Sequence, residues 1–224
     1  MTAEQFTREV MNTAEQAEFV ELARGLSADQ WSAPSLCAGL SVRDVIVHIA
    51  AHIHGEPSTR DTALKVIQSG FSISRTEKRI DRDQQRVHAS RATDNVIAWL
   101  AEPMKSPDSL TQLSELVIHQ QDIRRPLGLT RSIPADRLCA VLDYSLKGAG
   151  SRGVNYAHRR VRGLRLVATD LPWVWGTGPE VVGPGEALVM AVNGRDDALG
   201  DLSGPGLDVL TRCTSSWSKR FSTV

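Results

Sequence analysis

Three residues near the middle of the chain have the types and spacing that a metal site requires. Glu115, His119 and Asp122, in the segment "ELVIHQQDIRR", follow one another at steps of four and three residues. On a helix those steps bring the three side chains onto one stripe. Imidazole and carboxylate groups are ligands for divalent cations such as zinc. The stripe therefore indicates either one wall of a metal site or an ordinary solvated helix face.

A second pair of candidate ligands lies earlier in the chain. His48 and His52 are four residues apart in "VRDVIVHIAAH", and Glu115 and His119 have the same separation. Metal-binding helices use this spacing, although each pair alone is more often two partly exposed residues. The apolar residues of 42–53 form one helical face, and both histidines flank that face rather than lie at its centre. Two such pairs favour a shared site, but spacing alone does not select the ligands.

Composition and charge limit the classes of protein that the chain can form. Its 224 residues are enough for one large domain or two smaller ones, and 41% hydrophobic with 23% charged residues is typical of a globular protein. Lys plus Arg and Asp plus Glu both number 26, so no bulk charge attracts nucleic acid or an anionic membrane. The charge balance therefore argues against nucleic-acid and membrane partners; separately, we expect a monomer or homodimer.

The cysteines and the N-terminus indicate the compartment. The three cysteines lie far apart and are odd in number, which argues against a disulfide scaffold and for a reducing cytosol. The first residues are polar and charged, unlike a signal peptide. No apolar run approaches the ~20 residues that a membrane span needs. These features predict a cytoplasmic protein that is not bound to a membrane.

The elements that must position the candidate ligands are helical up to about residue 158. Ser41 and Asp44 form a capping-box pattern that opens one helix, and another begins near Asp108 and is stopped by Pro126. Further helices are expected over 13–26, 57–69, 75–104 and 133–150.

The pattern changes near residue 160. Residues 162–176 alternate as a strand does, 179–184 could form a second strand, and 185–195 and 207–213 have helical patterns. The sequence thus predicts an α+β protein, with a bundle of four main helices over 1–158 and a small α/β unit over 159–224.

Common catalytic motifs are missing from the sequence. It contains no P-loop, GxGxxG, GxSxG or HExxH pattern, which argues against the common nucleotide, hydrolase and zincin classes. The glycine-rich segment at 176–185 has the wrong spacing for a phosphate cradle and is typical of a turn.

Longer patterns resemble a known family. "WSAPSLCAGLSVRDVIVHIAAH" and "ELVIHQQDIRRPLG" are similar to the two motifs of the mycothiol-dependent maleylpyruvate isomerase family, a branch of the DinB-like helical bundles. The segment from "RGLRLVATDLPWVWG" to "AVNGR" is similar to the small C-terminal unit of many members. One departure is Leu40, where members usually carry tryptophan.

The resemblance implies a ligand set of His48, Glu115 and His119. Two imidazoles and one carboxylate suit zinc, the family's usual ion, and leave one coordination position open, as in catalytic sites. His52 then becomes a neighbour of the site.

Asp122 shares the stripe of His119 and is a candidate for orienting it from outside the ligand set. A salt bridge to Arg43 or Arg125 is the alternative role for this carboxylate.

The resemblance also implies a co-substrate, the thiol mycothiol. Metal coordination deprotonates a thiol, so a bound mycothiol would become a metal-activated thiolate that attacks a small electrophilic substrate. Isomerisation or S-transfer follows, depending on whether the thiol leaves again. On this interpretation Cys37 is a small packing residue, and Arg195 is the best-placed arginine for binding an anionic ligand or the cofactor.

Two other functions stay open. The first is a metal-dependent hydrolase of a small amide or ester, in which water occupies the open position. The second is a binding protein that keeps the fold without the chemistry. Metal analysis separates the binding protein from the two enzymes, and thiol dependence separates the enzymes from each other.

Overall fold

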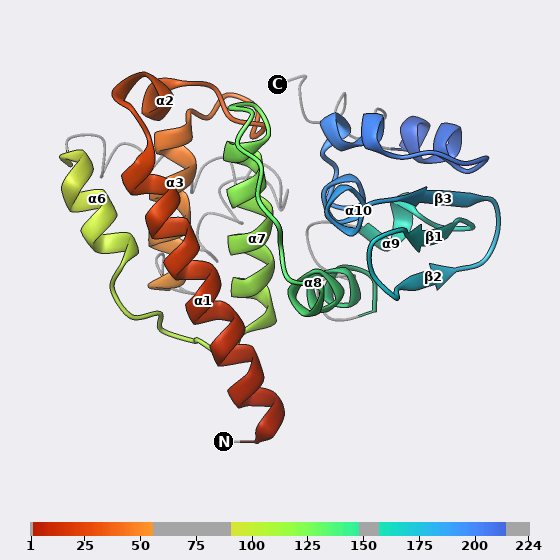
Figure 1. The fold of residues 1–224 in the computed structure, drawn as a ribbon, viewed down its shortest axis with the longest axis horizontal. Helices are drawn as coiled ribbons and strands as arrows, with labels where there is room; N and C mark the ends of the chain where they lie inside the picture. The colour runs from red at the N-terminus through yellow and green to blue at the C-terminus, as the bar shows by residue number, and fades with distance from the viewer. Residues whose placement is uncertain (1, 56–90, 148–156, 214–224) are drawn as a thin grey trace, which may run out of the picture. The chain divides into compact units, whose positions relative to one another are not determined.

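The structure, a computed structural model, describes residues 2–55, 91–147 and 157–213 (Figure 1). Its contacts divide the chain into two units, Met1–Thr130 and Arg131–Val224. The sequence predicted a boundary at residue 158. The division comes earlier because α8 (Ala135–Lys147) packs against α9 (Ala157–Arg160) and α10 (Gly185–Val192) of the second unit.

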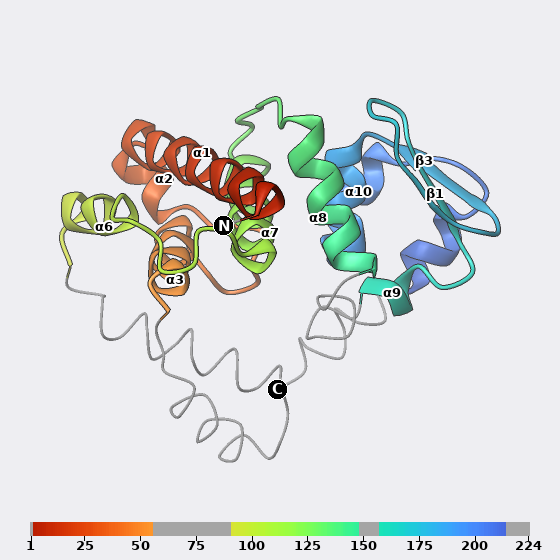
Figure 2. The same ribbon diagram turned by 90° about the horizontal axis from the view of Figure 1, so that it is seen from below.

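The first unit is a helical bundle. Its described helices are α1 (Ala3–Gly25), α2 (Ala28–Ser32), α3 (Val42–Ile53), α6 (Thr93–Leu100) and α7 (Leu110–Arg124). Helix α7 packs against α1 and α3, and α3 also packs against α6 (Figure 2). The helix expected over 57–69, and the part of 75–104 that precedes residue 91, lie outside the described residues.

Helix α3 begins and packs as its sequence predicts. The Ser41 side chain accepts from the backbone N–H of Asp44, and the Asp44 carboxylate accepts from the backbone N–H of Ser41, which completes the capping box. The apolar face is buried to 0% exposure at Val42, Val45, Ile46, Ile49 and Ile53. This burial fixes the rotation of α3, and with it the direction of the histidines that flank the face.

Helix α7 is buried in a different way, because many of its buried residues are polar. Its hydroxyl cap is Ser109, whose side chain accepts from the N–H of Gln112. The helix ends before Gly128, which has a φ of +68°, a conformation that favours glycine. The buried polar residues of α7 are Gln112, Ser114, Gln120, Gln121 and Asp122. Buried polar groups need partners, and those of α7 include groups on other helices: Gln120 donates to the Glu15 carboxylate of α1 at 2.8 Å, and Gln112 donates to the Ile53 carbonyl of α3 at 3.4 Å.

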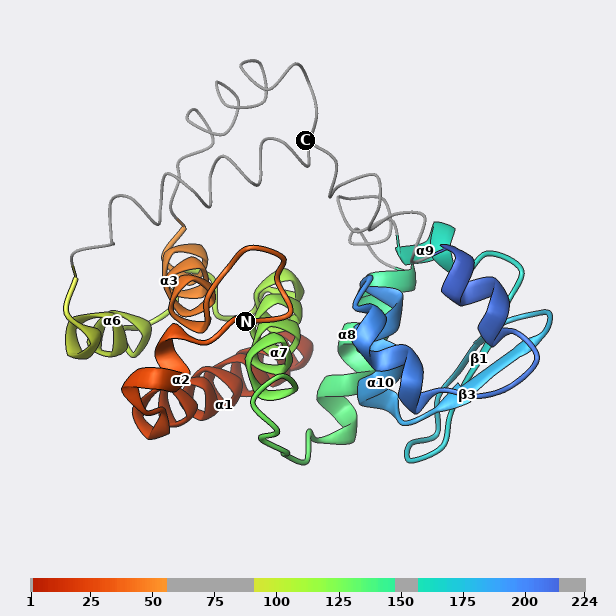
Figure 3. The same ribbon diagram turned by 90° about the horizontal axis from the view of Figure 1, so that it is seen from above.

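The second unit combines a small sheet with helices (Figure 3). Strands β1 (Arg165–Ala168), β2 (Val174–Gly176) and β3 (Glu180–Gly183) form one sheet in the order β2-β1-β3. β1 is antiparallel to β2 and parallel to β3. The single strand expected over 162–176 is therefore a hairpin, closed by the Ala168 N–H donating to the Trp173 carbonyl at 3.0 Å.

Side-chain contacts join the helices of the second unit to this sheet. The indole N–H of Trp173 donates to the Asp143 carboxylate of α8 at 2.8 Å. The expected helix over 185–195 is α10, which stops at Val192 and is followed by the 3-10 helix η2 (Asp196–Asp201). Residues 207–213 are helical, as predicted. The predicted α+β class, a helical bundle with a small α/β unit, is confirmed.

No helix in the described ranges combines the length and the apolar character that crossing a membrane requires.

Candidate metal site

The three ligands predicted from the resemblance come together in the first unit. His48 lies on α3, and Glu115 and His119 lie one turn apart on the neighbouring α7. The Oε2 atom of Glu115 is 3.7 Å from Nε2 of His48 and 3.1 Å from Nε2 of His119. The two imidazole rings meet edge to face, with centroids 5.1 Å apart. Two helices thus direct three donor atoms at a common point.

The spacing of these donors fits a tetrahedral cation. Ligand atoms about 2.1 Å from a tetrahedral ion are about 3.4 Å apart, and the two observed distances, 3.1 and 3.7 Å, lie on either side of that value. The side chains of His48 and Glu115 keep 26% and 24% of their surface exposed, so small molecules can reach them. The donor set of two nitrogens and one carboxylate oxygen is the chemistry that zinc prefers.

The other side of the His119 ring is arranged differently. Its Nδ1–H donates to Oδ2 of Asp122 at 2.8 Å, and the Asp122 side chain is completely buried. The thiol of Cys37 donates to the same Oδ2 atom at 3.1 Å, and its sulfur lies 3.6 Å from Nδ1 of His119. A separation of 2.8 Å is a charge-assisted hydrogen bond and is too short for two ligands of one ion. The donor atoms of Cys37, His119 and Asp122 also lie within 4.8 Å of one another, but the contact between His119 and Asp122 has the length of a hydrogen bond.

The two sides together perturb the pKa of His119. Burial lowers the pKa, but the sulfur of Cys37 and the hydrogen bonds to Asp122 and Glu115 outweigh burial and raise it well above the ordinary 6.5. Both ring nitrogens of His119 face carboxylate oxygens, so each N–H of the imidazolium has an acceptor. A cation at Nε2 would take the place of one of those protons.

The pKa values of Glu115 and His52 are also shifted. Burial raises the pKa of Glu115, but the hydrogen bonds from His119 and His48 outweigh it and hold that pKa well below its usual range. Burial lowers the pKa of His52 and outweighs the negative charge of Glu115, which would raise it. The ring of His52 stacks on that of His48 with centroids 6.3 Å apart. Among the described residues, the donor atoms of His52 belong to neither of the two groups that could share one ion, His48 with Glu115 and His119, and Cys37 with His119 and Asp122.

Sequence reasoning missed the role that geometry gives to Cys37. We expected a packing residue, and the half-buried Cys37 does pack against the core of the first unit. Its contact with Asp122 spans 85 residues of sequence. The one signal that could have found it was the presence of Cys37 in the same loop motif that leads into the helix of His48.

The arginine expected to bind an anionic ligand lies in the second unit. Nη1 of Arg195 donates to the backbone carbonyl of Asn193 at 2.9 Å. Burial, together with the positive charge of Arg195, lowers the pKa of Arg160 to about 10. The role of Arg195 in binding stays a prediction.

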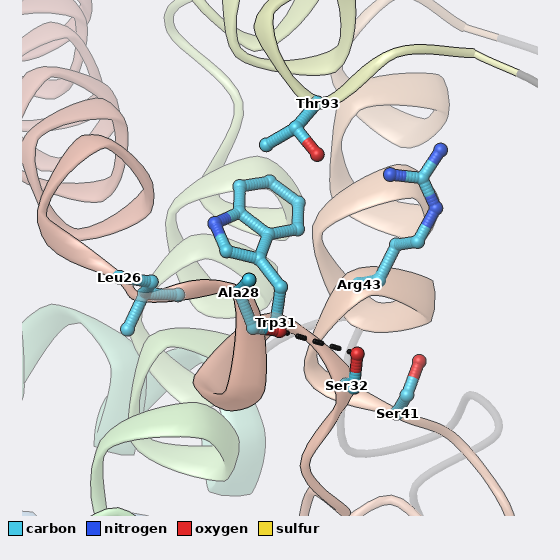
Figure 4. A pocket seen from close by; sticks show the side chains of 7 residues that line it. All are labelled: Leu26, Ala28, Trp31, Ser32, Ser41, Arg43 and Thr93. Atoms are coloured by element: carbon cyan, nitrogen blue, oxygen red, sulfur yellow. Dashed lines mark hydrogen bonds between the residues drawn. The ribbon is translucent and has the colours of Figure 1, made fainter.

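A separate cavity of about 670 Å³ opens in the first unit, near the start of α3 (Figure 4). The indole of Trp31 points into it toward Thr93, beside Arg43, and the Ser32 hydroxyl donates to the carbonyl of Ala28 at 3.2 Å. Its lining includes none of the donors described above. Its size alone does not make it the site of chemistry, because the Ser32 and Ser41 hydroxyls are hydrogen-bonded within the fold and neither group of possible metal ligands among the described residues lines it.

Comparison with known proteins bears on the fold and on the N-terminal part of the chain. Residues 13–104 match the model of the mycothiol maleylpyruvate isomerase N-terminal domain. One solved structure, a histidine-to-alanine mutant of mycothiol-dependent maleylpyruvate isomerase, shares the fold with a TM-score of 0.56 and 14% sequence identity. That alignment covers 92% of this chain and 96% of the other. No curated protein matches the chain at a significant level.

The fold is that of a DinB-like helical bundle with a small α/β unit. Over residues 13–104 the chain is similar to the N-terminal domain of mycothiol maleylpyruvate isomerase, and its fold is shared with the solved isomerase structure. The matched span contains the Cys37 loop and the helix of His48, and it ends before α7.

Proposed function

We propose that the protein is a cytoplasmic, metal-dependent enzyme that uses mycothiol for isomerisation of, or S-transfer to, a small electrophilic substrate. The observation that supports this proposal most strongly is the convergence of His48, from α3, with Glu115 and His119, from α7. A divalent cation held by these residues, zinc by its donor chemistry, would act as a Lewis acid that converts a thiol to its thiolate near neutral pH.

The residues of the chain prepare the site for that ion. Asp122 accepts the Nδ1–H of His119 and so fixes the tautomer in which the Nε2 lone pair faces Glu115 and His48. Glu115 supplies the anionic donor, and its depressed pKa keeps the carboxylate charged. The partial exposure of Glu115 and His48 leaves room for the sulfur of a small thiol.

The reactive sulfur comes from the co-substrate on this proposal. Cys37 lies against Asp122 and the Nδ1 side of His119, opposite the side that faces the other ligands. A free thiol with a pKa of ~8.5 is mostly protonated at neutral pH, so mycothiol gains reactivity when coordination removes its proton. Arg195 remains a candidate for binding an anionic group of either reactant.

A thiol-dependence experiment tests the proposal. The zinc-loaded protein is incubated with mycothiol and a panel of small electrophiles that includes maleylpyruvate, and products are identified by mass spectrometry. We expect mycothiol-dependent turnover of at least one electrophile. An isomer of unchanged mass indicates an isomerase, whereas a mass increase by one mycothiol indicates a transferase.

The control is Cys37→Ser, which keeps a polar hydrogen at this position but removes the sulfur. This variant should remain active, because the protein's own sulfur is not the nucleophile. Turnover without any thiol contradicts the proposal and favours the hydrolase. Loss of turnover in Cys37→Ser with zinc still bound also contradicts it and favours a protein nucleophile.

A further inference from the structure

We infer that Cys37 is a positioning residue of the metal site, which acts on His119 through the buried carboxylate of Asp122. The inference rests on the proposed function, because it concerns how the chain prepares a ligand for the ion. It assigns to the thiol a hydrogen-bonding role in place of the packing role expected from the sequence.

The loop that carries Cys37 is held rigidly by Ser35. The Ser35 hydroxyl accepts from the backbone N–H of Cys37 at 3.1 Å and donates to the carbonyl of Leu40 at 2.9 Å. The backbone N–H of Leu40 donates to the carbonyl of Cys37 at 2.9 Å. Because both ends of this short turn are tied to each other, the loop fixes the position of the Cys37 backbone, from which the thiol reaches Asp122.

The same loop contacts Asp122 at two points. The backbone N–H of Leu36 donates to the backbone carbonyl of Asp122 at 3.0 Å, and the Cys37 thiol donates to its side chain at 3.1 Å. One residue of α7 is thus held through both its main chain and its carboxylate by consecutive residues of the loop. A residue that only filled space would not require these two hydrogen bonds to Asp122.

The sulfur lies where a donor affects the orientation of the carboxylate. Asp122 has 0% exposure, and a buried carboxylate requires donors from the protein. Its Oδ2 atom accepts from both His119 and Cys37. The weak S–H donor complements the stronger N–H donor and holds Oδ2 in line with the ring of His119. The order of contacts runs from Cys37 to Asp122, then to His119, and then to Glu115.

A pair of substitutions separates hydrogen bonding from packing. Cys37→Ser keeps a donor of smaller size, and Cys37→Val fills similar space without a donor. Zinc affinity is measured for both variants and for wild type by competition with a chelator at fixed pH. We expect Cys37→Ser to stay close to wild type and Cys37→Val to weaken zinc binding roughly tenfold, the lower end of the range for residues outside the ligand set.

A double substitution tests whether Cys37 acts through Asp122. In an Asp122→Asn background, Cys37→Val should produce little additional loss of zinc affinity, since the contact it serves is already altered. Full additivity of the two losses overturns the inference. Wild-type affinity in Cys37→Val, or an equal loss in Cys37→Ser and Cys37→Val, also overturns it, since either result assigns Cys37 to packing.

A readout on zinc-free protein keeps this test separate from the proposed function. The proton resonance of the His119 Nδ1–H, assigned by nitrogen-15 NMR, should shift in Cys37→Val and remain near its wild-type position in Cys37→Ser. If wild type binds no zinc but this pattern is observed, the proposed function fails and the positioning contact stands. If zinc binds but neither variant moves the resonance, the proposed function stands and this inference fails.

Discussion

The two sides of the His119 ring use similar side chains for different purposes. Toward Nε2, Glu115 is the shared neighbour of two imidazoles at 3.1 and 3.7 Å, and these donors remain partly exposed. Toward Nδ1, Asp122 is completely buried and 2.8 Å away. The longer distances leave space for a cation between donors, whereas the short one is filled by a proton.

On the proposed function, distance and burial, rather than residue type, separate Glu115 as a ligand from Asp122 as the residue that orients a ligand. Both carboxylates contact the same imidazole, and both lie on α7. Only Glu115 also faces the histidine of the other helix. Substitutions on the Nε2 side should therefore abolish zinc binding, whereas substitutions on the Nδ1 side should only weaken it.

The largest effect is expected on the Nε2 side. His119→Ala removes one ligand of three, and we expect it to abolish zinc binding and mycothiol-dependent turnover. Zinc content after dialysis and a turnover assay measure the two effects, with circular dichroism to confirm folding. The control is His158→Ala in the second unit, which should retain both properties. A folded His119→Ala protein that keeps stoichiometric zinc contradicts the assignment.

A smaller effect is expected on the Nδ1 side. Asp122→Asn keeps the shape of the side chain but removes the charge that orients His119, so zinc affinity should fall ~10–100-fold without unfolding. Chelator competition measures the affinity, and a urea titration measures the free energy of unfolding. Unchanged zinc affinity would show that the two sides of the ring are not coupled.

In the metal-free protein, the pH dependence of the free energy of unfolding should report the contacts of His119 with Glu115 and Asp122. The pKa of His119 is raised on folding, so its contribution to stability is present below the ordinary value of 6.5 and is lost as pH rises through the folded pKa. In chelator, His119→Gln should therefore lower the free energy of unfolding more at about pH 6 than at about pH 9. Urea titrations at both values measure the difference. An equal loss at both would mean that the charged imidazole contributes nothing.

The smallest effect is expected at His52. Its ring stacks on His48, but its donors do not join the group that surrounds Glu115 and His119. His52→Ala should keep most of the zinc affinity and turnover. A loss as large as that of His48→Ala would show that the wrong member of the histidine pair was chosen.

Local features of this chain could be predicted from its sequence because they depend on near neighbours. The Ser41 and Asp44 capping box, the buried face of α3 and the four-residue step from Glu115 to His119 all appear in the structure as expected. The step of three to Asp122 likewise places its carboxylate against His119.

Features that depend on distant packing could not be predicted. The strand expected over 162–176 is a hairpin, and α8 packs with the second unit instead of the bundle. The thiol of Cys37 reaches Asp122 only because the loop and α7 are brought together by the fold. No local pattern encodes such a contact.

The most direct test of the shared site is an equilibrium zinc titration of wild type and His48→Ala. His48 comes from α3 while the other two ligands come from α7, so its removal tests whether the helices share one ion. We predict that wild type binds one zinc ion per chain and that His48→Ala, with its fold intact, loses that binding. Equal zinc binding by the two proteins, or no binding by wild type, would contradict the account.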